Sequence, residues 1–597
     1  MSSYTEDYLK EKLTEKLQAV HVFRKVNLFQ KRGITMENLV IYIFLIGIGK
    51  FLRASISLYP HSGQNAPPMF GDYEAQRHWQ EITVNLKLRN WYRNTTKNDL
   101  NYWGLDYPPL TAYHSYAMGM IAKTMDTSFI ALFQSRGIAT DNHKLFMRTS
   151  VLVADLLIYI PSLIVVCVAF FKEFNRSKKP RTVLSFVHMI LCIAYPGQIL
   201  IDNGHFQYNN VSLGFAALAV ACILKSKNVL ASLLFSLALN YKQMELYHAL
   251  PFFFYLLGNS FRDKDDKFNF TSGVLNLIKI GSTVIVTFGL IWSPWLRLGY
   301  KDTMQVLSRL FPIYRGVFED KVSNVWCIVN VFYKIKTHFT NEQMALICLT
   351  CTVAAVIPIS LHLLFNPKKK VFLYALLNTS LIFFLFSFQV HEKSILLATL
   401  PAMILFPLEP FACYWFLQIA TFSMFPLLLK DGLLVAYFAL QLIYFLGTKL
   451  VIGLVSEDKD FIRIDVFNIS QIIDLNETKS TNSKLKRTFF YLSIYFALVL
   501  IMLQLFAEPP KNLPFLYPLL ISAYSCVHFL MFLEVVDQSD GCGGKFAAVI
   551  VSPEFQGKSL LQRHRLVNSA LSEELKTIHA FSQKTFTPEQ WEAEKAK

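Results

Sequence analysis

Long apolar segments alternate with short polar segments along most of the chain. Many apolar segments hold about 20 uncharged residues, the length that a helix needs to cross a bilayer. We therefore predict about fourteen membrane-spanning helices. They lie at roughly 39–58, 149–171, 183–199, 209–225, 229–241, 245–258, 275–295, 343–365, 371–388, 394–409, 411–428, 432–452, 488–508 and 513–533. The predicted fold class is an α-helical polytopic membrane protein.

The apolar run 110–125 is short, follows two prolines and contains His114. We interpret it as an interfacial or dipping helix, because counting it as a span would reverse the orientation of every later segment. Basic residues support this choice. The loops that then face the cytosol, such as 172–181 and 456–487, all carry Lys or Arg.

This orientation places both termini in the cytosol and alternate loops in a lumen. Charged groups at the edge of a bilayer are costly and usually serve a function. Six polar clusters fall on the luminal side, namely Gly71–Trp79, Trp103–Pro109, Asp202–Asn209, Lys242–Tyr247, Arg309–Cys327 and Gln389–Lys393. We therefore expect these clusters to form one luminal site.

The composition agrees with a membrane protein. Of the 597 residues, 53% are hydrophobic and only 17% are charged, which excludes a single soluble domain. The 58 basic residues exceed the 42 acidic ones, but they lie in short loops where membrane orientation explains them, so nucleic-acid binding is not indicated. The nine Cys residues lie mostly inside apolar segments and show no framework spacing, so neither a disulfide framework nor a zinc site is predicted.

Two acidic residues of the first luminal loop are candidates for chemistry. Asp72 lies in the segment GDYEAQRHW. A nearby arginine would keep its carboxylate ionised, so that it can accept a proton from an attacking hydroxyl. Alternatively, Asp72 only caps the helix that EAQRHW predicts. Asp106 precedes a rigid Pro-Pro turn and is either a second acceptor-binding carboxylate or a turn residue.

Cationic residues at the predicted membrane boundary suit a phosphate. His391 and Lys393 stand between two apolar runs, and a desolvated phosphate of a lipid needs such donors and positive charge. Alternatively, Lys393 only extends its amine to the interface. Arg309 and Arg315 would add to the phosphate site, and His205 suits a sugar hydroxyl. The luminal segments contain no Gly-rich phosphate loop and no paired-aspartate metal motif, so no metal is expected there.

Several long segments in order resemble a known family over about 23–533. These are GDYEAQRHW, YWGLDYPPLTAYHSY, IDNGHFQYN, KQMELY, RLFPIYRGVFEDKVSNVWC and VHEKSILL. They resemble the dolichyl-phosphate-glucose glucosyltransferases of the endoplasmic reticulum, and the EDKVSN form resembles members that add the first glucose to Man9GlcNAc2-diphosphodolichol. The resemblance implies a GT-C glycosyltransferase that takes glucose from dolichyl phosphate β-glucose and forms an α-1,3 linkage with inversion.

The resemblance also assigns roles to residues. Asp72 would be the base that removes the proton of the mannose 3-hydroxyl, and His391 and Lys393 would hold the donor phosphate. The further substrate-binding candidates are Glu74, Arg77, Asp106, His205, Lys242, Arg309 and Arg315. No cofactor is implied. Hydropathy alone also permits a secondary transporter or lipid-sugar flippase, but the sequence shows no internal repeat of the kind common in transporters.

The polar tail 534–597 predicts a strand at Lys545–Ser552, a helix at Leu560–Leu575 and a further helix from Thr587. It resembles the C-terminal part of BolA-like proteins, which partner monothiol glutaredoxins. The amphipathic segment 1–22 resembles the helix that this part lacks. The two segments would therefore complete one small α+β BolA-like domain, which the transferase region 23–533 divides.

The BolA resemblance implies a metal cluster in this domain. In that family a loop Cys and a C-terminal His bind a [2Fe-2S] cluster shared with the glutaredoxin, and the matching residues here are Cys542 and His579. Alternatively, Cys542 is an ordinary loop thiol and His579 lies at the edge of a helix.

The division of the BolA-like domain has two explanations. One is a genuine insertion, which is feasible because both termini are expected in the cytosol. The other, which we favour, is that the sequence joins exons of two separate genes. On a blot of cell extract with antibodies to each part, we expect separate bands near about 10 and 60 kDa. A single band that carries both epitopes would establish the fusion instead.

Overall fold

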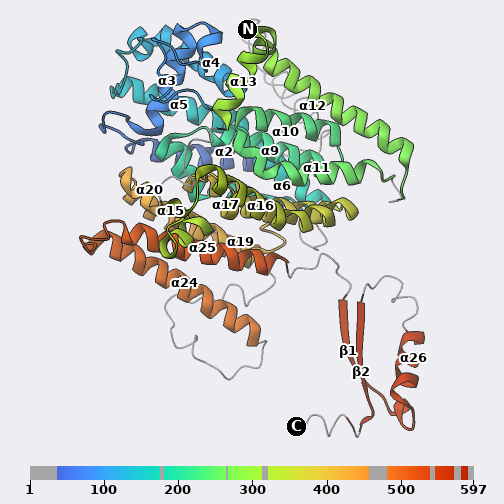
Figure 1. Ribbon diagram of the computed structural model, residues 1–597. Coiled ribbons are helices and arrows are strands. Elements are labelled where there is room, and N and C mark those ends of the chain that lie inside the picture. Colours follow the sequence, from blue (N-terminus) through green and yellow to red (C-terminus); the bar gives the residue numbers. More distant parts are fainter. Residues whose placement is uncertain are drawn as a thin grey trace, which may run out of the picture. The chain divides into compact units, whose positions relative to one another are not determined.

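The computed structural model describes residues 36–174, 181–263, 267–311, 321–455, 481–537, 545–570, 580–588 and 590. The chain divides into two compact units, Met1–Leu533 and Glu534–Lys597. The first unit is built of helices, and the described residues of the second form two strands and a helix (Figure 1). The predicted fold class is confirmed. The helix predicted at 1–22 lies outside the described residues.

Every predicted span coincides with helical structure. The α-helices described between residues 36 and 537 are α2 (Met36–Ser57), α3 (Gly71–Asn85), α4 (Pro109–Met125), α5 (Asp141–Ala154), α6 (Ile160–Phe174), α7 (Arg181–Ile193), α8 (Pro196–Ile199), α9 (Asn209–Leu224), α10 (Asn228–Tyr241), α11 (Leu246–Ser260), α12 (Phe270–Leu298), α13 (Tyr300–Leu310), α14 (Val325–Phe332), α15 (Ile335–His338), α16 (Asn341–Phe365), α17 (Lys369–Phe386), α18 (Leu396–Leu405), α19 (Pro410–Ser423), α20 (Phe425–Lys430), α21 (Leu434–Val455), α24 (Thr481–Phe506) and α25 (Leu516–Asp537).

Not all of these helices have the length of a full span. In the described part of the chain, eight helical segments are long and apolar enough to cross a membrane. They are Leu39–Ser57, Asp141–Phe174, Leu184–Phe206, Phe270–Leu298, Asn341–Phe365, Lys369–Phe386, Thr488–Phe506 and Leu516–Leu533. Most of the other predicted spans are shorter or interrupted, as at α18 and α19, whereas α21 has 22 residues. Irregular backbone is tolerated at membrane depth where protein or a polar cavity surrounds it.

The segment between the first two predicted spans is largely helical. Helices α3 and α4 pack against each other. Helix α4 is not among the described segments with the length and hydropathy of a span, which agrees with its interpretation as an interfacial or dipping helix. The turn before α3 needs glycine, because Gly71 has φ 72° and an added Cβ would lie 2.6 Å from Ser62 Oγ. This close approach fixes the start of α3 against the loop that follows α2.

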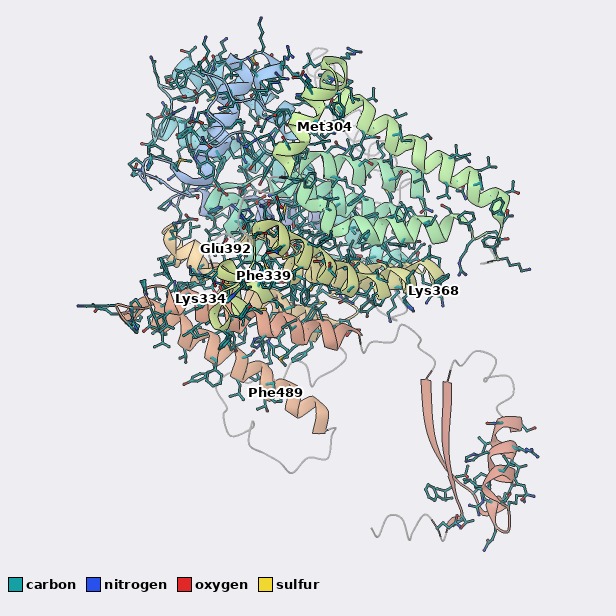
Figure 2. All side chains as sticks on the ribbon, in the orientation of Figure 1. Met304, Lys334, Phe339, Lys368, Glu392 and Phe489 are labelled. Atoms are coloured by element: carbon teal, nitrogen blue, oxygen red, sulfur yellow. The ribbon has the colours of Figure 1, made fainter. Side chains whose placement is uncertain are left out.

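Burial separates the interior helices from the peripheral ones. Nearly every residue of α9 is buried, and α9 packs against α6 and α10. A helix that is apolar all round belongs in the interior. By contrast, α12 and α24 expose large apolar side chains, such as Leu290 and the labelled Phe489 (Figure 2). Exposed apolar surface of this kind suits contact with lipid.

A π-helical segment, Leu200–Phe206, ends the span that begins at Leu184. The guanidinium of Arg148 on α5 donates to the carbonyl oxygens of Asn203 (2.5 Å), Gly204 (2.8 Å) and Pro60 (3.0 Å). One buried arginine therefore ties this segment to the loop after α2. Such π-helical geometry is frequent at functional sites.

The C-terminal unit contains two parallel strands. Strand β1 (Lys545–Val551) pairs along its length with β2 (Ala580–Phe586), and α26 (Leu560–Ala570) packs on β2. The predicted strand is confirmed. The predicted helix is confirmed as far as Ala570, and 571–579 lie outside the described residues. Strand β2 was not predicted, because AFSQKTF lacks a regular alternation of apolar and polar residues.

The helix start predicted at Thr587 is present. Thr587 and Gln590 exchange two hydrogen bonds between side chain and backbone, which is the pattern of a capping box.

Candidate active site

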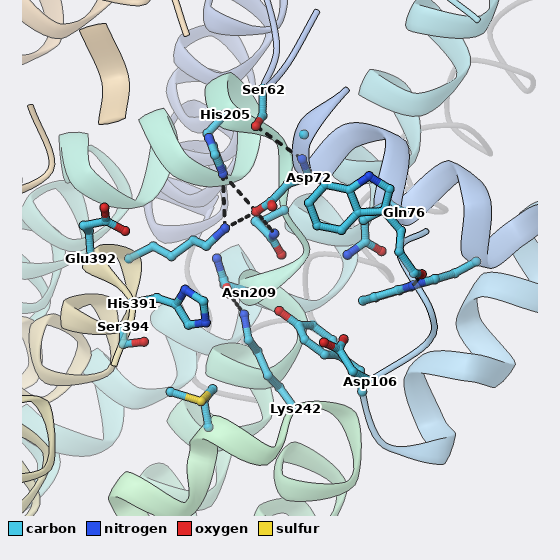
Figure 3. A pocket seen from close by; sticks show the side chains of 18 of the residues that line it. Ser62, Asp72, Gln76, Asp106, His205, Asn209, Lys242, His391, Glu392 and Ser394 are labelled. Atoms are coloured by element: carbon cyan, nitrogen blue, oxygen red, sulfur yellow. Dashed lines mark hydrogen bonds and ion pairs between the residues drawn. The ribbon is translucent and has the colours of Figure 1, made fainter. Parts of the chain in front are cut away.

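A cavity of about 510 Å³ lies in the first unit, where five of the six polar clusters meet. This volume suits a small-molecule site. Its lining includes Asp72, Gln76, Trp79, Trp103, Asp106, Tyr107, His205, Gln207, Asn209, Lys242, Met244, His391 and Lys393. Figure 3 shows the labelled side chains of Asp72, His205, Asn209, Lys242 and His391 around one space.

Only one of the two carboxylate oxygens of Asp72 is hydrogen-bonded to described residues. Its Oδ2 accepts hydrogen bonds from Lys393 Nζ and Gln207 Nε2 (2.5 Å), and lies 2.9 Å from His205 Nε2 (Figure 3). Its Oδ1 has no hydrogen-bond partner among the described residues. Asp72 does not cap α3, because the N-cap is Phe70 and Asp72 lies within the first turn. The alternative interpretation of Asp72 as a helix cap is therefore wrong.

His205 stands between two carboxylates. Its Nδ1 lies 2.5 Å from Asp431 Oδ2, while its Nε2 lies 2.9 Å from Asp72 Oδ2. A doubly protonated ring donates to both. Sequence reasoning missed Asp431, although the signal was present. Lys430 and Asp431 lie between two predicted spans, at the same predicted luminal side of the membrane as the six clusters, and a glycine follows them.

Opposing effects set the charge of Asp72. Burial by itself would raise the pKa of this carboxyl, but the positive charges of Lys393 and His205 outweigh burial and hold the pKa well below its usual value. Asp72 is therefore ionised at neutral pH. The cation beside it is Lys393, from a distant part of the chain, rather than a neighbouring arginine as the sequence suggested.

A second amine faces the same cavity. Lys242, directly after α10, donates to Asn209 Oδ1 at the start of α9. Burial, followed by the positive charge of Lys393, lowers the pKa of Lys242 to about 8. Lys242, Lys393 and His391 thus give the cavity donors and positive charge for an anionic ligand.

Two of the predicted substrate-binding residues belong to the framework of α3. Arg77 pairs with Glu74 (2.5 Å) and Glu81 (2.6 Å) and donates to Ser135 Oγ (2.5 Å). All four residues are buried. Glu74 and Arg77 are not among the described residues that line the cavity. They fasten α3 to the segment that follows α4.

Of the remaining predicted site residues, the structure describes Arg309 but not three others. Arg309 on α13 donates to the carbonyl oxygens of Gly104 (3.0 Å) and Leu105 (3.3 Å) and so supports the loop that carries Asp106. Arg315, Cys542 and His579 lie outside the described residues.

A helical membrane protein whose polar cavity holds an ionised acid beside one buried and one partly buried amine has the architecture of a polytopic membrane enzyme. Residues 39–535 match the model of the ALG6, ALG8 glycosyltransferase family, and the chain belongs to this family.

Several relatives align with this chain over nearly their whole length. The chain is 47% identical over 486 residues to a probable dolichyl pyrophosphate Man9GlcNAc2 alpha-1,3-glucosyltransferase of Drosophila melanogaster, covering 81% of this chain and 95% of the relative. It is 46% identical over 500 residues to the enzyme of that name in Gallus gallus, covering 83% and 96%. A probable enzyme of that name in Dictyostelium discoideum is 43% identical over 507 residues, covering 85% and 96%.

The C-terminal unit is similar to a different family. Residues 531–590 match the model of BolA-like proteins. This match supports the resemblance of the tail, and it covers both described strands and α26.

The pKa of Lys242 leads to a prediction about pH. If Lys242 binds an anionic substrate in its charged form, kcat/KM for that substrate should fall above pH about 8, where the free amine loses its proton. Lys242→Arg retains its charge and should move this alkaline limb to higher pH, as measured by the pH profile of glycosyl transfer.

The matched control is Lys97→Arg, at an exposed lysine in the first loop, which should leave the profile unchanged. An alkaline limb at the same pH in Lys242→Arg would contradict the assignment.

Proposed function

We propose that the chain transfers glucose from dolichyl phosphate β-glucose to the terminal mannose of Man9GlcNAc2-diphosphodolichol, forming an α-1,3 linkage with inversion. The observation that carries this proposal is the one-sided binding of Asp72, whose Oδ2 is held by three donors while Oδ1 has no described partner. The acceptor and linkage follow the names of relatives that are 43% to 47% identical.

Asp72 acts as the general base in this proposal. Its Oδ1 accepts the proton of the mannose 3-hydroxyl while the hydroxyl oxygen attacks the anomeric carbon of glucose. The bond between that carbon and the phosphate oxygen breaks, and dolichyl phosphate leaves with the electron pair. One displacement converts the β-linked donor into an α-linked product. Phosphate is a good leaving group, so the reaction needs little help from an acid.

The amines hold the donor phosphate. Lys393 and Lys242 line the same cavity as His391, and together they offer positive charge and several N–H donors. In the structure Lys393 is paired with Asp72. When a phosphate draws this ammonium away, burial of Asp72 is opposed by less positive charge and its pKa rises. Donor binding thereby makes Asp72 a stronger base.

The position of the site suits substrates carried by lipids. Its charged residues lie where helices end: His205 is in the last turn of the candidate span Leu184–Phe206, Lys242 follows α10, Lys393 lies between α17 and α18, and Asp431 precedes α21. These ends all fall on the face that the charge pattern assigns to the lumen. We infer an active site at the luminal surface of the endoplasmic reticulum membrane, with both termini in the cytosol.

Substitution of the base tests this proposal. Asp72→Asn keeps the shape of the side chain but removes its basicity, so transfer should fall by at least about 100-fold. The assay combines purified protein with a synthetic lipid-phosphate glucose and a lipid-linked Man9GlcNAc2 acceptor. Donor binding and expression should stay close to those of the wild type.

The control is Asp99→Asn, at an exposed aspartate of the same loop, which should retain full transfer. Activity of Asp72→Asn within a few-fold of the wild type would remove the base assignment.

For the C-terminal unit, we propose that Cys542 and His579 bind a [2Fe-2S] cluster together with a monothiol glutaredoxin. The match of 531–590 to BolA-like proteins and the parallel β1–β2 pair support this proposal. The transferase itself needs no cofactor in the proposed mechanism.

Co-purification with a glutaredoxin tests the cluster. The full chain, produced together with a monothiol glutaredoxin, should carry iron and show the visible absorption of a [2Fe-2S] cluster. Cys542→Ala should reduce the iron content or change the spectrum, because thiolate ligands determine both. Cys222→Ala, at a buried cysteine in α9, is the control. An identical spectrum in all three proteins would refute the assignment.

A further inference from the structure

Two cysteines and a histidine meet inside the helical unit, away from the active-site cavity. Cys167 lies on α6, and His188 and Cys192 lie one turn apart on α7. Their side chains are almost fully buried, with exposed fractions of 0%, 2% and 1%. The two sulfur atoms and a ring nitrogen all lie within 4.8 Å of one another. Both helices belong to candidate membrane spans.

The histidine is held in one tautomer by its surroundings. His188 Nε2 lies 2.7 Å from the carbonyl oxygen of Met403 on α18, and a carbonyl can only accept, so Nε2 carries the hydrogen. His188 Nδ1 then keeps its lone pair. Among the described residues this buried atom has no hydrogen-bond partner. A histidine that ligates a metal characteristically donates its other N–H to a carbonyl in this way.

The sulfur atoms are spaced for a shared ligand rather than for a bond to each other. Cys167 Sγ and Cys192 Sγ lie 4.0 Å apart, whereas sulfurs in a disulfide lie about 2.05 Å apart. Two sulfurs that each bind one metal at about 2.3 Å lie roughly 3.8 Å apart in tetrahedral geometry and roughly 4.0 Å apart in trigonal geometry. The observed separation therefore fits a cation between them.

We propose that Cys167, His188 and Cys192 bind a soft metal cation of the Zn²⁺ or Cu⁺ class. Thiolate and imidazole ligands select these ions over hard cations such as Mg²⁺. A dithiolate also offsets the charge of Zn²⁺, which lowers the cost of burying the ion.

The cation would join three helices. It links α6 to α7 directly, and the hydrogen bond between His188 and Met403 connects α7 to α18. The short turn before α18 carries Lys393, which pairs with Asp72 in the cavity. The metal site therefore supports α18, the helix that directly follows the turn with Lys393. It takes no part in the chemistry of transfer.

Metal content of the purified full chain tests the site. The protein is exposed to buffered Zn²⁺, or to Cu⁺ under reducing, anaerobic conditions, then freed of excess ion and measured by elemental mass spectrometry. Wild-type protein should hold about one ion per chain more than Cys167→Ala/Cys192→Ala. With Co²⁺ as a probe, only protein with the intact site should gain thiolate-to-cobalt absorption from it.

The matched control is Cys222→Ala/Cys413→Ala, which removes two buried cysteines from other helices and should keep the ion. His188→Gln can still donate an N–H to Met403 but loses the imidazole, and should weaken metal binding by at least about tenfold. Cys542 and His579 are present in every variant, so their contribution cancels. Equal metal content in all variants, or a Cys167–Cys192 disulfide in non-reducing peptide mapping, would overturn the proposal.

Discussion

The ion pair between Asp72 and Lys393 is the interaction on which the site depends. It joins residues 321 positions apart, and both side chains are mostly buried. Such a pair repays its loss of hydration only when further hydrogen bonds complete it. His205 and Gln207 supply them to Asp72, and Asp431 in turn holds His205. Four separate segments of the chain must therefore meet at one point, and the packing of the helices that carry these segments has to bring them together.

The support for this meeting point comes from buried residues that are not among the described lining of the cavity. Asn203, in the π-helical segment, donates to Asp155 Oδ2 (2.8 Å), and Asp155 also pairs with Arg53 of α2 (3.1 Å). Arg148 binds the carbonyl oxygen of Asn203 from another side. Ionised groups inside membrane spans are costly. Here they hold the irregular backbone that presents His205 at the end of a span.

Sequence patterns predicted the helices and much of the cavity, but not its internal contacts. Apolar length located the spans, and the charge pattern placed Asp72, Lys242 and Lys393 on one face. Sequence proximity misled at Arg77, which pairs with carboxylates on its own helix rather than serving Asp72. Pairing across hundreds of residues, as with Asp431, depends on tertiary packing that local periodicity does not record. Short interior helices also depart from the length rule, since protein replaces lipid around them.

The pairing of Asp72 with Lys393 gives the proposed reaction an order. While the ammonium is paired with Asp72, it lowers the basicity of the carboxylate, so Asp72 is then poorly suited to activate water. A bound phosphate competes for the same ammonium, and burial then raises the basicity of Asp72 when a glycosyl group is present to be attacked. On this mechanism the cation that binds the leaving group also controls the base, which favours transfer to the acceptor over premature activation of a hydroxyl.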